Sequence, residues 1–188
     1  MVLVEADDAE TIKAFQTKWQ SIDVEIGSGN GHFLVEFAQR YPDIGFIGIE
    51  AKKKRCLKIQ QKIKSRQIEN ILVFHGTAEV FLHDFIAVPI HALHVYFPDP
   101  WPKTKHRRRR FMKKDMLSEL MQLLAPHGKL YFASDVFDYY LQVKILGILE
   151  TGAMLSDDSI PDEAKGSLFC ARTAAVGKKT NGIVLQKI

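Results

Sequence analysis

The chain has 188 residues, of which 46% are apolar and 26% are charged. This length and composition predict one soluble globular domain, residues 1–188, and argue against a disordered chain. The two cysteines, Cys56 and Cys170, give neither a disulfide framework nor a zinc motif, so we expect no metal site and a reducing, cytoplasmic location. No apolar run approaches the ~18 residues of a transmembrane helix, so we expect no membrane partner.

The net charge of +4 conceals an uneven distribution of charge. Residues 52–66 and 103–114 contain sixteen of the 26 basic residues and no acidic residue. The rest of the chain holds ten basic residues against 22 acidic ones. A positive face of this kind attracts polyanions, which favours a nucleic-acid partner. A merely solvated surface would be a better explanation for one charge run than for two.

Apolar runs alternate with turns along the chain, and their lengths and periodicities predict alternating strands and helices. We expect strands at residues 22–26, 46–49, 71–74, 91–97 and 130–133, with weaker ones near 152–155 and 182–187. We expect helices at residues 31–40, 52–66, 78–86, 111–124 and 136–150. This alternation predicts an α/β fold with a mostly parallel sheet and helices on both faces.

The first predicted strand ends in a glycine-rich turn, E-I-G-S-G-N-G, at residues 25–31. Glycines allow a backbone to approach a ligand closely, and ligands of such sheets bind outside the carboxyl ends of the strands. A dinucleotide fingerprint requires G-x-G-x-x-G, whereas Gly27 and Gly29 begin G-x-G-x-G. With Glu25 two residues before the first glycine, the turn resembles motif I of the class I S-adenosylmethionine methyltransferases.

The ends of the next two predicted strands carry further candidates for cofactor binding. Glu50 lies about 20 residues past the glycines, where a carboxylate can bind a ribose diol, although it could instead pair with Lys52 or Lys53. NAD and S-adenosylmethionine both have that diol. Thr77 stands where methyltransferases of this class often place an acid against the adenine amine, and its hydroxyl could accept one hydrogen bond. Glu25 is either an anchor of the turn or a partner of the methionine ammonium.

The fourth predicted strand runs into F-P-D-P-W-P-K at residues 97–103, followed by T-K-H-R-R-R-R at residues 104–110. Three prolines in five residues make a stiff loop, which presents Asp99 and Trp101 beside a basic run suited to phosphates. These residues could instead form only a rigid turn with a core tryptophan. The position at a strand end, next to the basic run, favours a site.

The stretch at residues 97–110 resembles the signature of the tRNA (guanine-N7-)-methyltransferases of the bacterial TrmB type. The resemblance covers roughly residues 22–140. Residues 124–130, L-A-P-H-G-K-L, are similar to the family's L-x-P-G-G, and Ser134-Asp135 followed by Tyr139 is similar to its T-D-x-x-x-Y. The resemblance implies a class I S-adenosylmethionine methyltransferase, Rossmann-like, with a mostly parallel seven-stranded sheet.

By this resemblance, the chain would methylate N7 of the variable-loop guanine in tRNA, as a monomer or homodimer. Asp99 would be the catalytic acid, close to the cofactor. The other cofactor contacts would be Glu25, Gly27, Gly29, Glu50 and Thr77. The expected substrate-binding residues are Lys103, Asp135, Trp101, His106, Arg109 and Arg110.

Three features depart from the family pattern. Only about 20 residues precede the first strand of the motif-bearing region, where the family usually has an extension. Thr77 replaces the adenine-side acid. The C-terminal T-x-[FY]-E motif is not intact, because neither residues 167–170 nor the competing alignment at Arg172-Thr173 has a glutamate at the fourth position. How the guanine is held from that side is therefore open.

Other functions remain open at the level of sequence. An exocyclic-amine nucleic-acid methyltransferase would carry N/D-P-P-Y/F/W, and Asp99-Pro100-Trp101 lacks the second proline. A small-molecule methyltransferase would not need sixteen clustered basic residues. A non-catalytic RNA-binding module that kept the fold is a third alternative. Guanine N7 has a free lone pair, so we expect Asp99 to position the base and stabilise charge rather than to remove a proton.

Overall fold

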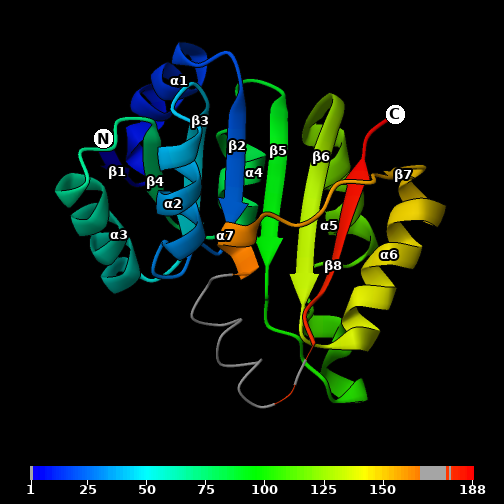
Figure 1. Ribbon diagram of the computed structural model, residues 1–188. Coiled ribbons are helices and arrows are strands. Elements are labelled where there is room, and N and C mark those ends of the chain that lie inside the picture. The colour runs from blue at the N-terminus through cyan, green and yellow to red at the C-terminus, as the bar shows by residue number, and fades with distance from the viewer. Residues whose placement is uncertain (1, 166–176, 178) are drawn as a thin grey trace. The chain divides into compact units, whose positions relative to one another are not determined.

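The computed structural model describes residues 2–165, 177 and 179–188, and the chain forms two compact units, residues 1–91 and 92–188. Figure 1 shows the course of the chain through both. In the first unit, four parallel strands pair in the order β1-β4-β3-β2. The strands are β1 (Val2–Val4), β2 (Ile22–Ile26), β3 (Gly45–Glu50) and β4 (Ile71–His75).

Helices cover both faces of the sheet in the first unit (Figure 1). They are α1 (Ala9–Lys18), α2 (His32–Arg40), α3 (Lys53–Ser65) and α4 (Ala78–Asp84), with a short 3-10 helix, η1 (Ala6–Asp8), before α1. The inner stripe of α3 is Cys56, Ile59 and Ile63, all buried in one cluster with α2 and the sheet. On the opposite face, the ring of Phe74 packs against Phe81 of α4, with centroids 4.9 Å apart.

The register of the first unit brings three strand ends to one edge. Glu25 pairs with Gly48, and Glu50 pairs with His75. Because these strands are parallel, the segments that follow β2, β3 and β4 all leave from the same edge of the sheet. This edge is where the sequence places the cofactor-binding residues of the first unit.

The described part of the second unit contains most of β5 (Ile90–Tyr96), which begins in the first unit, and three further strands that pair antiparallel. These strands are β6 (Leu124–Ser134), β7 (Met154–Leu155) and β8 (Asn181–Gln186). β8 pairs antiparallel with both β6 and β7. Its helices are η2 (a 3-10 helix, Thr104–Arg109), α5 (Lys114–Leu123), α6 (Phe137–Thr151) and α7 (Asp162–Lys165). α5 and α6 pack against each other and against β6.

The predicted α/β fold class is confirmed, with differences in detail. The described residues hold eight strands rather than seven, because three apolar residues at the N-terminus form β1, which is too short for a periodic signal. The stretch at residues 124–130, which is similar to the family's L-x-P-G-G, lies within β6, where His127 has a φ of 61°. Among the described residues, no helix is long and apolar enough to span a membrane.

Candidate active site

The glycine turn after β2 is fixed by backbone hydrogen bonds and leaves open space beside it. Gly27 and Gly29 have φ values of 78° and 57°, which glycine adopts without the strain that a Cβ would bring. The amides of Gly27 and Ser28 donate to the carbonyl of Ile49 at 2.9 and 3.0 Å. A Cβ built on Gly27 would meet no atom within 4 Å. The turn therefore has room for a ligand against its backbone.

Glu50 ties this turn to the end of β3. Its side chain is buried, and its Oε2 accepts a hydrogen bond from the amide of Gly29 at 2.9 Å. Its Oε1 accepts from the amide of Lys52 at 2.9 Å, while the ammonium of Lys53 pairs with Glu5. A carboxylate offers about four acceptor positions, so Glu50 can still accept hydrogen bonds from a diol. The sequence did not predict its contact with the turn.

Glu25 is buried just before the glycine turn. Its Oε2 has no hydrogen-bond partner among the described residues. Burial raises the pKa of Glu25 to about 8, with a further contribution from the charge of Glu50. A buried carboxylate oxygen without a partner is costly, so a cation placed beside it would favour the ionised form of Glu25. This environment suits an ammonium partner better than a purely structural anchor.

Thr77 lies where β4 leads into α4, and it caps that helix. Its hydroxyl accepts a hydrogen bond from the amide of Val80 at 3.4 Å. The amide of Gly76 donates to the carbonyl of Glu50 at 3.2 Å, which places this segment beside the end of β3. The contact of Thr77 with adenine stays a prediction, and capping α4 is a second task that the residue performs.

In the second unit, the loop after β5 carries an exposed Asp99 between two strained residues. Phe97 and Trp101 have φ values of 51° and 41°, where aromatic residues are rarely found. The amide of Phe97 donates to the carbonyl of Ala133 in β6 at 2.9 Å, which fixes the start of the loop. The three prolines predict stiffness, and the structure adds backbone strain on both sides of the carboxylate.

Trp101 is half-buried between residues of the basic run. The guanidinium of Arg109 lies 4.9 Å from its ring centroid, and the ring of His106 lies 5.8 Å away in a T-shaped contact. The amide of His106 donates to the carbonyl of the exposed Lys103 at 2.8 Å. Trp101 is therefore not a core residue, and two of the expected substrate-binding residues, Arg109 and His106, contact its ring.

Arg110 corrects one of the sequence-based expectations. We expected it to bind substrate, but its side chain is only 1% exposed. Its guanidinium donates to the carbonyl of Pro100 at 2.9 Å, to Gln142 at 2.7 Å and to Asp138 at 2.8 Å. A guanidinium engaged in this way is poorly placed to contact a phosphate, because it would have to leave three partners in the protein interior.

Several other basic residues are also engaged within the protein. In the first basic segment, Arg55 lies 3.5 Å from Glu50, and the ammonium of Lys62 donates to the carbonyl of Asn30 at 2.8 Å. In the second, Lys114 pairs with Glu150. The exposed cations of the second segment are Lys103, Lys105, Arg107, Arg108, Arg109, Lys113 and Lys114. Fewer than sixteen charges are therefore fully available to a polyanion.

Asp135 and the C-terminal motif are the remaining positions that the sequence singled out. Asp135 is half-buried between β6 and α6. The two candidate positions for the C-terminal motif, residues 167–170 and 172–173, lie outside the described residues. Among the residues that are described, no cluster of three or more His, Cys, Asp or Glu side chains could hold a metal ion.

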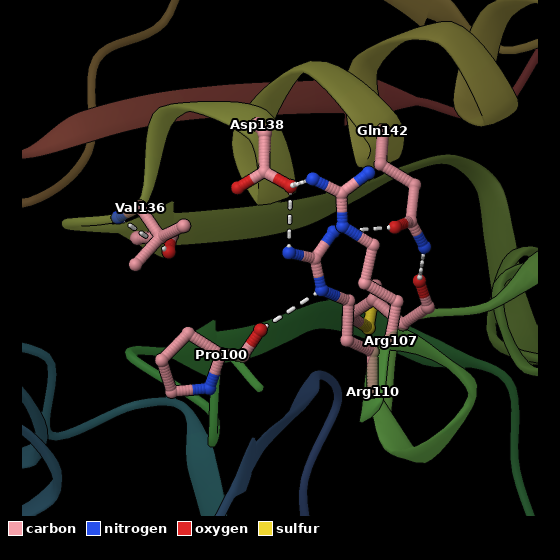
Figure 2. A network of polar contacts seen from close by, with 8 residues as sticks. Pro100, Arg107, Arg110, Val136, Asp138 and Gln142 are labelled. Atoms are coloured by element: carbon pink, nitrogen blue, oxygen red, sulfur yellow. Dashed lines mark hydrogen bonds and ion pairs between the residues drawn. The ribbon is translucent and has the colours of Figure 1, made fainter. Parts of the chain in front are cut away.

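The sequence did not predict that side chains of α6 contact the arginine that holds the Asp99 loop. Asp138 and Gln142 accept hydrogen bonds from Arg110 (Figure 2). The ring of Tyr139 lies 4.6 Å from the same guanidinium. Burial raises the pKa of Tyr139 to about 12, so its hydroxyl stays protonated. The only available signal was Tyr139 in the S-D-x-x-x-Y stretch, which matched a motif without indicating its contacts.

Comparison with solved structures supports the class of fold. The chain superposes on the 16S rRNA methyltransferase KamB with a TM-score of 0.67, covering 96% of this chain and 92% of that one at 16% identity. It superposes on a precorrin-6y C5,15-methyltransferase from Geobacter metallireducens with a TM-score of 0.63, covering 98% and 94% at 12% identity. The fold, with its glycine turn after β2, is that of the class I, Rossmann-like methyltransferases.

Comparison with sequences identifies the family. Residues 19–153 match the family model Methyltransf_4, described as "Putative methyltransferase". The chain is 32% identical to a tRNA (guanine-N(7)-)-methyltransferase of Geobacter metallireducens over 83% of this chain and 77% of that protein. It is 34% identical to one from Latilactobacillus sakei over 75% and 68%. The chain belongs to the tRNA (guanine-N7-)-methyltransferase family of the TrmB type.

Proposed function

We propose that this chain transfers a methyl group from S-adenosylmethionine to N7 of the variable-loop guanine in tRNA. The observation that carries the proposal is the exposed Asp99 on a fixed loop that leads directly into a basic 3-10 helix. The names of the relatives in the family agree with this substrate. We treat residues 1–188 as one catalytic domain, working in the cytoplasm where tRNA is modified.

The residues of the first unit fit the methyl donor. The unpartnered Oε2 of Glu25 suits the ammonium of the methionine part. Glu50 has acceptor capacity for the ribose diol, and the open space at Gly27 admits a ligand against the backbone. S-adenosylmethionine would supply an electrophilic methyl group on a positively charged sulfur. The roles of Glu25, Gly27, Gly29, Glu50 and Thr77 are parts of this proposal.

The second unit would handle the guanine. In the transfer, the bond from N7 to the methyl carbon forms as the carbon–sulfur bond breaks, and the electron pair of that bond stays on sulfur. No proton leaves N7, so the positive charge passes to the purine. The carboxylate of Asp99 would accept hydrogen bonds from the guanine N1–H and N2–H₂ and stabilise that charge. Asp99 therefore acts as a positioning and electrostatic group.

The exposed cations would bind the tRNA backbone. A variable-loop guanine whose N7 is hidden by tertiary pairing must leave its stack before it can react. Arg109 and His106 contact Trp101, and together with Lys103 and Asp135 they are the proposed substrate contacts. Trp101 offers an aromatic surface for a displaced base, although its ring already contacts two of these side chains.

The test is labelled methyl transfer to unmodified tRNA transcripts with and without the variable-loop guanosine. We expect incorporation only into the first transcript, with the label mapped to N7 by aniline cleavage at that nucleotide. Label on an exocyclic amine would replace the proposal with the rival methyltransferase class. S-adenosylmethionine binding in calorimetry without any transfer to tRNA would contradict the proposed substrate, and no binding at all would indicate a non-catalytic RNA-binding module.

A further inference from the structure

The loop that carries Asp99 has a backbone conformation that it would not keep by itself. Phe97 and Trp101, two residues to either side of Asp99, lie in the left-handed region with φ values of 51° and 41°. Side chains with a Cβ rarely adopt this region, and they persist there only when surrounding contacts hold them. Some group in the second unit must therefore supply those contacts.

Arg110 makes the contact at the centre of this loop. Its Nε donates to the carbonyl of Pro100, the residue between Asp99 and Trp101, at 2.9 Å. Its two terminal nitrogens donate to Gln142 at 2.7 Å and Asp138 at 2.8 Å, both on α6 (Figure 2). The planar, five-donor guanidinium thus joins the loop to a helix through one rigid group.

The anchoring side of this network is itself fixed. The amide nitrogen of Gln142 donates to the carbonyl of Met112 at 3.0 Å. The amide of Met112 in turn donates to the hydroxyl of Tyr139 at 2.9 Å. The ring of Tyr139 also lies 4.6 Å from the guanidinium of Arg110. The helix face that receives Arg110 therefore cannot shift without breaking other buried contacts.

We propose that Arg110 is the positioning residue of the Asp99 loop, holding the Pro100 carbonyl against α6 so that the Asp99 carboxylate is preorganised for substrate. This inference rests on the proposed function for its kinetic consequence. Its structural content, a loop fixed by one buried guanidinium, does not depend on which substrate the loop receives. Arg110 touches no reacting atom and acts through Pro100.

A role in phosphate binding fits the same residue poorly. The side chain is 1% exposed, and the neighbouring Arg107 and Arg109 are exposed members of the same run. Replacing arginine by lysine separates the two roles, because a single ammonium keeps the charge but cannot bond Pro100, Gln142 and Asp138 together. A phosphate contact would tolerate that change, whereas a clamp would not.

The kinetic experiment compares Arg110→Lys with Arg40→Lys, an exposed arginine of the first unit outside both basic segments. Methyl transfer to unmodified tRNA is measured at saturating cofactor. We expect Arg110→Lys to lower kcat by about ten- to a hundred-fold, as for a misplaced catalytic group, while the KM for tRNA changes by less than about three-fold. Arg40→Lys should retain both values.

A second measurement needs no activity. In a Trp19→Phe background, Trp101 is the remaining tryptophan, and the indole nitrogen of Trp19 has no hydrogen-bond partner to lose. We expect Arg110→Lys to raise acrylamide quenching of Trp101 and to speed tryptic cleavage in residues 103–109. The same substitution at the exposed Arg108 should change neither. Gln142→Ala removes only one of the three acceptors, so it should shift both readouts in the same direction and by less, even if Arg110→Lys does not fold.

The outcomes separate this inference from the proposed function. If Arg110→Lys and Gln142→Ala keep wild-type quenching and cleavage, Arg110 does not position the loop. If Arg110→Lys instead raises the KM for tRNA while kcat and quenching stay unchanged, it is a phosphate contact after all. If the wild-type chain transfers no methyl group to tRNA, the proposed function fails, yet altered quenching in the variants would still support the clamp.

Discussion

Four consecutive arginines have different environments: Arg107, Arg108 and Arg109 end the 3-10 helix η2, and Arg110 is its C-cap residue. In a 3-10 helix, side chains three residues apart lie above one another. Arg107 and Arg110 therefore face the same way, and each places a nitrogen 2.8 Å from the same oxygen of Asp138. Arg109 faces Trp101, and Arg108 is exposed to solvent. At the scale of single residues, identical side chains thus serve as a clamp, a stacking partner and a free cation.

The first residue-scale prediction concerns Asp99. Asp99→Asn keeps the shape of the side chain but removes its charge and turns one acceptor toward guanine into a donor. We expect kcat/KM for tRNA methylation to fall by about a hundred- to a thousand-fold, as for loss of a charge-stabilising group. Asp43→Asn, an exposed aspartate that also follows a proline, is the matched control. Near-wild-type turnover of Asp99→Asn would refute the electrostatic role.

Burial raises the pKa of Glu25 from 4.5 to about 8. Between these values the folded chain binds a proton that the unfolded chain lacks, so this group's contribution to stability is full below pH 4.5 and is lost as the pH rises to about 8. Glu25→Gln removes this loss. As the pH rises through that window, the free energy of unfolding of Glu25→Gln should increase relative to that of the wild type by up to about 1.4 kcal/mol per pH unit.

Urea denaturation of wild type and Glu25→Gln between pH 5 and 8 measures the effect, with the pH range taken from the shift of the pKa of Glu25. All other titrating groups are common to both proteins, so the difference isolates position 25. Glu69→Gln, an exposed glutamate of the same unit, controls for the loss of one negative charge. A constant difference between wild type and Glu25→Gln across this range would show that the carboxyl is ionised in the folded chain.

Among the secondary-structure elements, α3 contacts the glycine turn and the start of α2. The ammonium of Lys62 donates to the carbonyl of Asn30 at 2.8 Å. Gly31, at the N-cap of α2, has a φ of 68°, and a Cβ there would lie 2.8 Å from a side-chain carbon of Ile59. At Gly27 only the backbone conformation requires a glycine. At Gly31 both the backbone conformation and the packing against α3 require one.

Alanine substitutions at these two glycines should differ in cost. Both replace a glycine at positive φ, but only Gly31→Ala also forces a Cβ into α3. We expect Gly31→Ala to lose about 1–3 kcal/mol more stability than Gly27→Ala, the usual cost of overpacking. Chemical denaturation of both variants checks this. Equal losses would mean that α3 moves aside without cost and does not fix the turn.

At the scale of the whole molecule, function depends on how many cations a polyanion can reach. Exposed charges release counterions when they neutralise phosphates, so tRNA binding should weaken with salt at a log–log slope of several units. Arg108→Gln should reduce that slope by about one. Lys114→Gln should reduce it less, because this ammonium pairs with Glu150. Filter binding at several salt concentrations measures the slopes, and a flat wild-type response would exclude the basic segments as the RNA footprint.

The local sequence was sufficient for several features of this protein. Hydrophobic periodicity predicted the alternation of strands and helices, because burial follows spacing: Cys56, Ile59 and Ile63 are buried at helical spacing along α3, whereas Leu57, which lies off that stripe, is exposed. The glycine turn, the stiff loop at Asp99 and the family resemblance could be read from neighbouring residues, because turn chemistry is local. The strand β1 could not, since its three residues carry no period and pair with the distant β4.

Tertiary structure alone decided which charged groups are available for chemistry. The sequence shows four arginines in a row, but burial and partners depend on α6, about thirty residues further along the chain, as the contacts of Arg110 with Asp138 and Gln142 show. The same holds for Glu25, whose pKa is raised by burial and by the charge of Glu50, a residue 25 positions further along the chain. Electrostatic environment is a property of everything within a few ångströms in space, which periodicity and motif spacing along the chain do not encode.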